Sequence, residues 1–97
     1  MKTALQFLRR LMGRVSQDEK FRVLPFGRDE LKYIEEDHEL LAQAELGTSP
    51  DRILYASTIS KWLPPYEQEP ISPERKQEII NRLVDYYKRQ KVTCDVA

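Results

Sequence analysis

Side chains that could perform acid–base or nucleophilic chemistry are few and scattered in this chain of 97 residues. The one histidine is His38, the one cysteine is Cys94, and the paired carboxylates Glu35 and Glu36 have no neighbouring nucleophile in sequence. Nucleophilic catalysis needs a nucleophile beside a positioned base, and a structural zinc site needs about four Cys or His ligands. We therefore expect no enzyme, no metal site and no cofactor.

Each of these residues has a structural interpretation instead. His38 lies in the polar run from Glu35 to His38, so we expect a solvated turn residue. Cys94 alternates with polar neighbours in a predicted strand and shares its apolar side with Val92 and Val96. A thiol on a core-facing side is buried and unreactive.

Composition narrows the class of protein further. Hydrophobic residues make up 40% and charged residues 33%, and 16 basic residues balance 16 acidic ones. A zero net charge argues against a nucleic-acid-binding domain, which is typically strongly basic. One cysteine excludes a scaffold held by internal disulfides. No apolar run approaches the ~18 residues of a membrane span, so we expect a cytoplasmic protein.

Residues 1–16 are predicted to form an amphipathic, basic N-terminal helix. At 100° per residue, six apolar side chains fall on one side and four basic ones on the other. They are Ala4, Leu5, Phe7, Leu8, Leu11 and Met12, opposite Lys2, Arg9, Arg10 and Arg14. One interpretation is a helix docked on the core of its own domain. The other is that residues 2–12 bind a partner groove or an anionic membrane surface.

Residues 17–97 are predicted to form a single α+β domain, beginning with a short apolar strand at 21–26 that Pro25 confines to an edge. Apolar residues in 30–46 scatter over a helical wheel but alternate as in strands, which favours a hairpin over a single helix. A Pro- and Gly-containing loop at 47–51 separates this hairpin from the next segment.

The second half of the domain is predicted to contain a strand, a helix and a final strand. Residues 53–62 are rich in β-branched and aromatic side chains, as in a central strand. Ser72 and Pro73 form a helix start, followed by an apolar stripe. Residues 92–96 alternate as a strand. The expected fold is a mainly antiparallel sheet of about four to five strands with the C-terminal amphipathic helix on one face, plus the N-terminal helix.

Charge is concentrated in the predicted hairpin. Residues 29–45 hold seven acidic residues and one basic residue, a local net charge of −6. Such a patch could steer a basic partner, or it could keep an edge hairpin soluble and unpaired. The candidate partner-binding acids are Glu35, Glu36, Asp37 and Glu39.

Trp62 and Tyr66 flank two prolines and complete the set of candidate partner-binding residues. Aromatic side chains beside prolines on a loop are typical of interface hot spots. The structural alternative, which we favour for Trp62, is that its indole closes the core beneath the loop. Tyr66 is expected to be freer to face solvent.

Several segments together resemble a known family. They include Tyr33, Glu45-Leu46, the run Ser57 to Trp62 with Pro64-Pro65, the helix start Ile71-Ser72, and Ile79-Ile80. Over residues 31–97 the chain resembles the immunity protein 74 family of bacterial polymorphic toxin systems. The resemblance implies a non-enzymatic inhibitor that binds a cognate toxin domain. The alternative is an adaptor or regulatory protein that uses its basic N-terminal helix.

Overall fold

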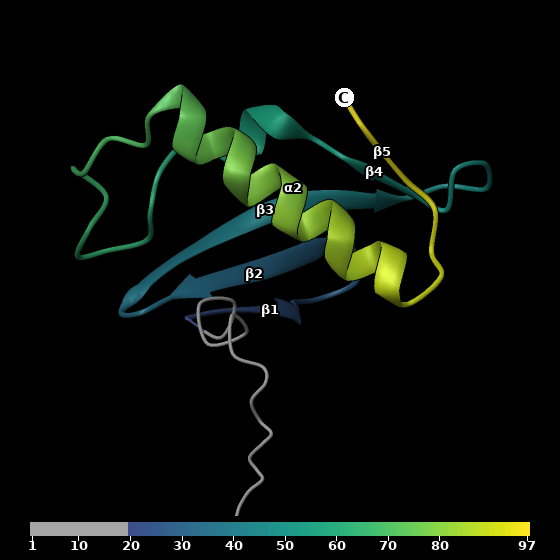
Figure 1. The fold of residues 1–97 in the computed structure, drawn as a ribbon, viewed down its shortest axis with the longest axis horizontal. Helices are drawn as coiled ribbons and strands as arrows, with labels where there is room; N and C mark the ends of the chain where they lie inside the picture. The colour runs from purple at the N-terminus through teal and green to yellow at the C-terminus, as the bar shows by residue number, and fades with distance from the viewer. Residues whose placement is uncertain (1–19) are drawn as a thin grey trace, which may run out of the picture.

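The computed structural model describes residues 20–97, which form a five-stranded sheet and one long helix (Figure 1). The elements are β1 (Phe21–Pro25), β2 (Glu30–Glu35), β3 (His38–Leu46), β4 (Arg52–Leu54), the 3-10 helix η1 (Ala56–Thr58), α2 (Pro73–Arg89) and β5 (Cys94–Val96). The strands lie across the sheet in chain order. Three neighbouring pairs are antiparallel, and β4 with β5 is parallel. The predicted α+β class and strand number are confirmed, and the sheet is mixed.

The hairpin predicted for residues 30–46 is confirmed, and its alternative, a single helix, is wrong. In the register of β2 and β3, Tyr33 lies opposite Leu40 and Leu31 lies opposite Ala42. All four side chains are buried, as alternation predicts for one face of a strand pair. Glu36 adopts a φ of 55° in the tight turn between the two strands.

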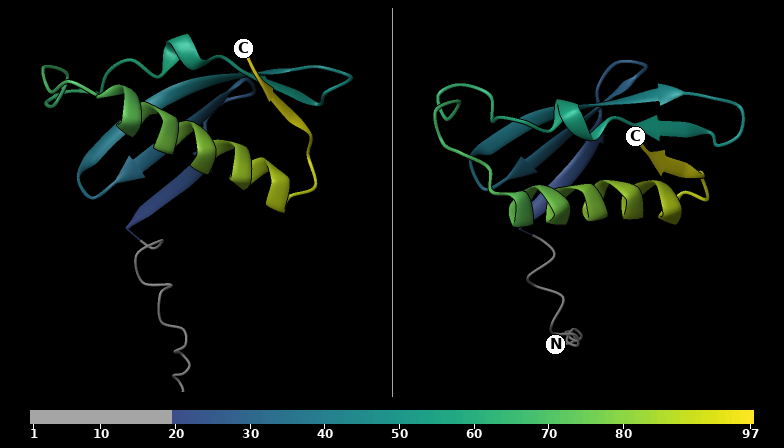
Figure 2. Two further views of the ribbon diagram at one scale, coloured as in Figure 1. Left: turned by 45° about the horizontal axis from the view of Figure 1, so that its top comes forward. Right: turned by 90° about the horizontal axis from the view of Figure 1, so that it is seen from above.

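Helix α2 packs across the buried face of the sheet, and Figure 2 shows the two layers from two directions. Its start is as predicted, because the Ser72 hydroxyl accepts a hydrogen bond of 3.1 Å from the Arg75 amide. Such a cap satisfies one of the amides that a helix start leaves without a partner. The apolar stripe faces the sheet through Ile79, Ile80, Leu83 and Tyr87.

The strand predicted for residues 53–62 is mostly wrong. The strand is limited to Arg52–Leu54, and after Tyr55 the chain turns into η1. The Thr58 hydroxyl stabilises this turn by donating to the Tyr55 carbonyl at 2.6 Å and accepting from the Gln43 amide at 3.0 Å. Such side-chain bonds compete with a strand ladder. The turn also lets Ile59 and Trp62, three residues apart, both reach the core.

The final strand is confirmed but is shorter than predicted, at Cys94–Val96. Cys94 is half-buried against the core, and burial raises the pKa of its thiol. The predicted N-terminal helix at 1–16 lies outside the described residues. Within residues 20–97, no helix is long and apolar enough to cross a membrane.

Candidate binding cleft at the hairpin turn

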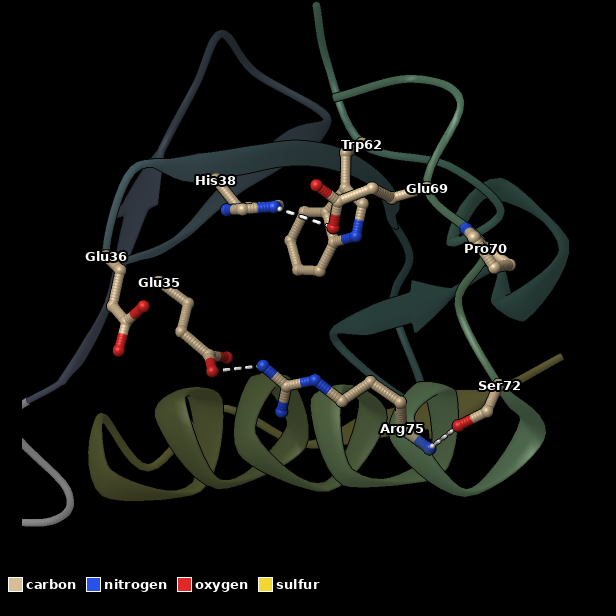
Figure 3. Close-up of a pocket in the computed structure, with 8 residues that line it drawn as sticks. All are labelled: Glu35, Glu36, His38, Trp62, Glu69, Pro70, Ser72 and Arg75. Carbon is tan, nitrogen blue, oxygen red and sulfur yellow. Dashed lines mark hydrogen bonds and ion pairs between the residues drawn. The ribbon is translucent and has the colours of Figure 1, made fainter. Parts of the chain in front are cut away.

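A cleft of about 430 Å³ opens where the β2–β3 turn meets the connection before α2 and the first turn of α2 (Figure 3). The lining residues come from three parts of the chain, and most of them are charged. They are Glu35, Glu36, His38, Trp62, Glu69, Pro70, Ser72 and Arg75. The cleft therefore combines the acidic turn predicted from the sequence with residues far along the chain.

His38 is held between two aromatic rings and two carboxylates. Its imidazole stacks on Tyr66 with centroids 3.8 Å apart and meets the edge of Trp62 at 5.0 Å. Its Nδ1 lies 2.9 Å from Asp37 and its Nε2 lies 3.0 Å from Glu69. The prediction that His38 is a solvated turn residue is therefore wrong. The proline-rich connection folds over the ring and leaves 21% of the side chain exposed.

This environment favours the charged imidazole. Burial opposes protonation, but the hydrogen bonds to Glu69 and Asp37 outweigh it and raise the pKa of His38. Both ring nitrogens face carboxylate oxygens, and only the imidazolium can donate through both. In its protonated form, His38 can therefore link the hairpin turn to the connection through both ring nitrogens.

Tyr66 and Asp37 are joined directly. The Tyr66 hydroxyl donates a hydrogen bond to the Asp37 carboxylate. This bond, followed by the one from His38, lowers the pKa of Asp37, and the same carboxylate raises the pKa of Tyr66. Tyr66 was expected to be freer to face solvent, but it is half-buried. Its ring therefore covers His38 while its hydroxyl fastens the turn.

Glu35 is engaged within the fold. It forms ion pairs with Arg75 and, at 3.3 Å, with Arg82, and it accepts a 2.6 Å hydrogen bond from Tyr33. Burial opposes its charge, but the Arg75 and Tyr33 contacts lower the pKa of Glu35 overall. Burial and the hydrogen bond to Glu35 raise the pKa of Tyr33 to about 12. The carboxylate joins β2 to α2.

The two remaining acids differ from each other. Glu36 is exposed, and its carboxylate makes no hydrogen bond or ion pair with any residue between 20 and 97. Glu39 lies on the opposite face of β3 from the buried Leu40 and pairs with Lys32 at 3.4 Å. The structure thus brings Glu35, Glu36 and Asp37 to the cleft region and places the Glu39 side chain elsewhere.

Trp62 forms part of the cleft wall and of the core at once, with 5% of its surface exposed. Its ring lies 6.4 Å from Tyr33, centroid to centroid. The preferred structural interpretation of Trp62 agrees with this position. Glu69 and Arg75 were not predicted as part of the site, because nothing in their local sequence patterns shows that they meet the turn. The helix-start signal at Ser72 was the only pointer to that region.

The cleft is suited to binding by charge and hydrogen bonding. Its one hydroxyl group, on Ser72, already caps α2. Among residues 20–97, no group of three or more His, Cys, Asp or Glu side chains could hold a metal ion. The nearest to a reactive pair is His38 with Asp37 and Glu69, which contains no nucleophile.

A family model described as Immunity protein 74 matches residues 23–97. The chain belongs to this family. The match covers the whole cleft and begins within β1, so the family domain starts earlier than the resemblance at residue 31 indicated. Neither a search of curated proteins nor a search of solved structures gave a match. Membership of the Immunity protein 74 family makes this an immunity-type protein.

Proposed function

We propose that this Immunity protein 74 domain binds a cognate bacterial toxin domain and neutralises it stoichiometrically. Membership of the family over residues 23–97 is the observation that carries the proposal. The exposed Glu36 in the acidic turn supports it, because a carboxylate that forms no ion pair with another residue between 20 and 97 can attract a basic surface. A standard interface would bury about 800 Å² on each partner.

The candidate residues have different roles in this proposal. Glu36 is exposed, lines the cleft and forms no ion pair within the described part of the chain, so its charge is available to a partner. Asp37 and Tyr66 hold the turn against the connection, and Glu35 holds it against α2. Trp62 supports the wall from the core. Glu39 contributes to the general negative potential from the other sheet face. Such mutual fastening presents the turn in one conformation, which reduces the entropy lost on binding.

The test begins with affinity capture from lysate of the native host, followed by production of the captured protein and its domains. The expected result is a toxic domain that forms a 1:1 complex, measured by light scattering, and whose toxicity disappears when this protein is co-expressed. A tight complex that leaves toxicity unchanged would rule out neutralisation. Glu30→Gln serves as a control variant, because it alters an exposed acid at the far end of β2. This variant should protect fully against the toxin.

A second candidate function rests on the basic amphipathic pattern of residues 2–12. This segment precedes the family match, so it could add a membrane or partner contact to the family domain. Capture with a version lacking residues 1–15 separates the two. A toxin held by both versions supports binding through the α+β domain. Loss of partner or membrane material from the shortened version alone would favour the N-terminal segment.

A further inference from the structure

We infer that the cleft at the hairpin turn receives a lysine or arginine side chain of the partner, with a backbone carbonyl of the same segment bound by Trp62. This inference rests on the proposed function and adds the chemistry of the group that is recognised. Two independent observations support it: an unpaired donor in the cleft wall, and an excess of carboxylates around it.

The unpaired donor is the indole N–H of Trp62. The residue is only 5% exposed, and it lines the cleft. Its N–H makes no hydrogen bond to any described residue. Figure 3 shows the indole nitrogen turned toward the open space between Glu69 and Arg75. Among the described residues, the indole nitrogen is not one of the fully buried polar atoms that lack a partner, so it is reachable from the cleft. The N–H of a largely buried tryptophan usually forms a hydrogen bond. A ligand that brings an acceptor would satisfy it.

The charges around this donor select a cation. Three of the lining residues are glutamates, and even with His38 protonated beside Arg75 the lining keeps a net charge of −1. Arg75 is already paired with Glu35. Glu69 uses one oxygen to contact His38, which leaves its other oxygen and the whole carboxylate of Glu36 for a ligand. An anionic ligand would meet these two carboxylates at close range and be repelled.

A basic residue in a peptide chain satisfies both requirements together. Its ammonium or guanidinium group can lie between Glu36 and Glu69, and a main-chain carbonyl of the same segment can accept from Trp62. A free amine or a metal ion lacks the acceptor, and an apolar side chain lacks the charge. The mixed aromatic and acidic lining also suits the long aliphatic stem of lysine or arginine.

The test adds small probes to the full chain. Tryptophan occurs once in the sequence. The indole N–H of Trp62 therefore gives one signal in a ¹H–¹⁵N spectrum. N-acetyl-arginine methylamide and its lysine counterpart should shift this signal saturably. N-acetyl-leucine methylamide, which lacks the charge, and methylguanidinium, which lacks the carbonyl, should each move it less. Equal shifts with all four probes, or no shift with the basic ones, would overturn the inference.

Two variants test the named groups. Glu36→Gln should weaken binding of the arginine probe about two- to fivefold, as expected for one exposed ion pair, whereas Glu30→Gln should not. Trp62→Phe keeps an aromatic ring but removes the donor. The affinity of this variant for the arginine probe should therefore be no higher than its affinity for methylguanidinium. The Glu36 backbone amide then serves as the reporter. Unchanged affinity in either variant would contradict the assigned geometry.

These results remain separable from the fate of the proposed function. If the basic probes bind but no toxic partner is neutralised, the cleft is a site for basic peptides and the immunity role fails. If a toxin is neutralised equally well by the protein and by Glu36→Gln with Trp62→Phe, the immunity role stands and the inference about the cleft fails.

Discussion

The imidazole of His38 lies parallel to the phenol ring of Tyr66, with their centroids 3.8 Å apart and an angle of 17° between the planes. His38 begins β3, and Tyr66 belongs to the connection that precedes α2. The stack therefore fastens an irregular segment to the end of the hairpin. Asp37 and Glu69 complete the contact by hydrogen bonding to the two sides of the imidazole.

We predict that stability falls as pH rises above the ordinary pKa of histidine. The folded pKa of His38 is raised from 6.5, so folding takes up a proton between the two values. The stabilisation is complete below about pH 6.5 and is lost as pH passes through the folded pKa. Urea unfolding from pH 6 to 9 measures this change. His38→Phe keeps a ring but should remove the pH dependence, and an equal slope in the variant would contradict the assignment.

Glu35→Gln should lower the free energy of unfolding by about 1.5–3 kcal/mol, the range for hydrogen bonds to charged groups. The variant loses the ion pairs to Arg75 and Arg82. The pKa of Glu35 is lowered from 4.5, so its contribution is present above about pH 4.5 and is lost as pH falls through the folded pKa. Glu36→Gln is the matched control, with an expected change within about 0.5 kcal/mol. Chemical denaturation at pH 7 and at pH 3 distinguishes the two.

Trp62→Ala should cost about 3–5 kcal/mol of stability, as for other buried aromatic residues replaced by alanine. The side chain is almost completely buried and contacts the rings of Tyr33 and His38. Tyr66→Ala, at a half-buried position, should cost less. Thermal unfolding monitored by circular dichroism compares the two. A mild effect of Trp62→Ala would mean that the indole contributes little to the core.

Glu36→Lys should slow association with a toxin partner and reduce the dependence of the rate on salt. Exposed charges act mainly on association rates, and salt screens them. Stopped-flow measurements between 20 and 300 mM salt, about a fourfold change in Debye length, would reveal the effect. Asp95→Lys changes another exposed acid, on β5, and should alter the rate less. Identical kinetics for both variants would exclude the turn from the encounter.

Local patterns were sufficient to predict the hairpin and α2. Alternation across residues 30–46 and the cap at Ser72 depend on neighbouring residues, and both appear in the structure as expected.

The prediction of a strand at 53–62 was wrong for the opposite reason. Its β-branched residues favour extension, but the hydroxyl of Thr58 forms hydrogen bonds with Tyr55 and with Gln43 of a different strand. A contact with another strand cannot be read from the segment itself.

The candidate cleft was predictable only on its hairpin side. The acidic turn was apparent from the density of carboxylates, and the structure places Glu35, Glu36 and Asp37 there. The contacts of His38 were not predicted, because Tyr66 and Glu69 lie in an irregular connection whose course brings them to the imidazole. Likewise, the sequence indicated that the Glu35 carboxylate was available for a partner, whereas in the structure it is paired with Arg75 and Arg82.

The order of strands in the sheet also bears on how the protein acquires its structure. Strands β1 to β3 pair with their immediate neighbours along the chain, so residues 21–46 can form a meander by closing only short loops. The parallel pairing of Arg52 with Cys94 instead spans the entire connection and α2. Pairings between residues far apart in the chain form more slowly, because closing a long loop costs more entropy. We therefore expect the meander to form first, and α2 and β5 to dock later and shield its apolar face.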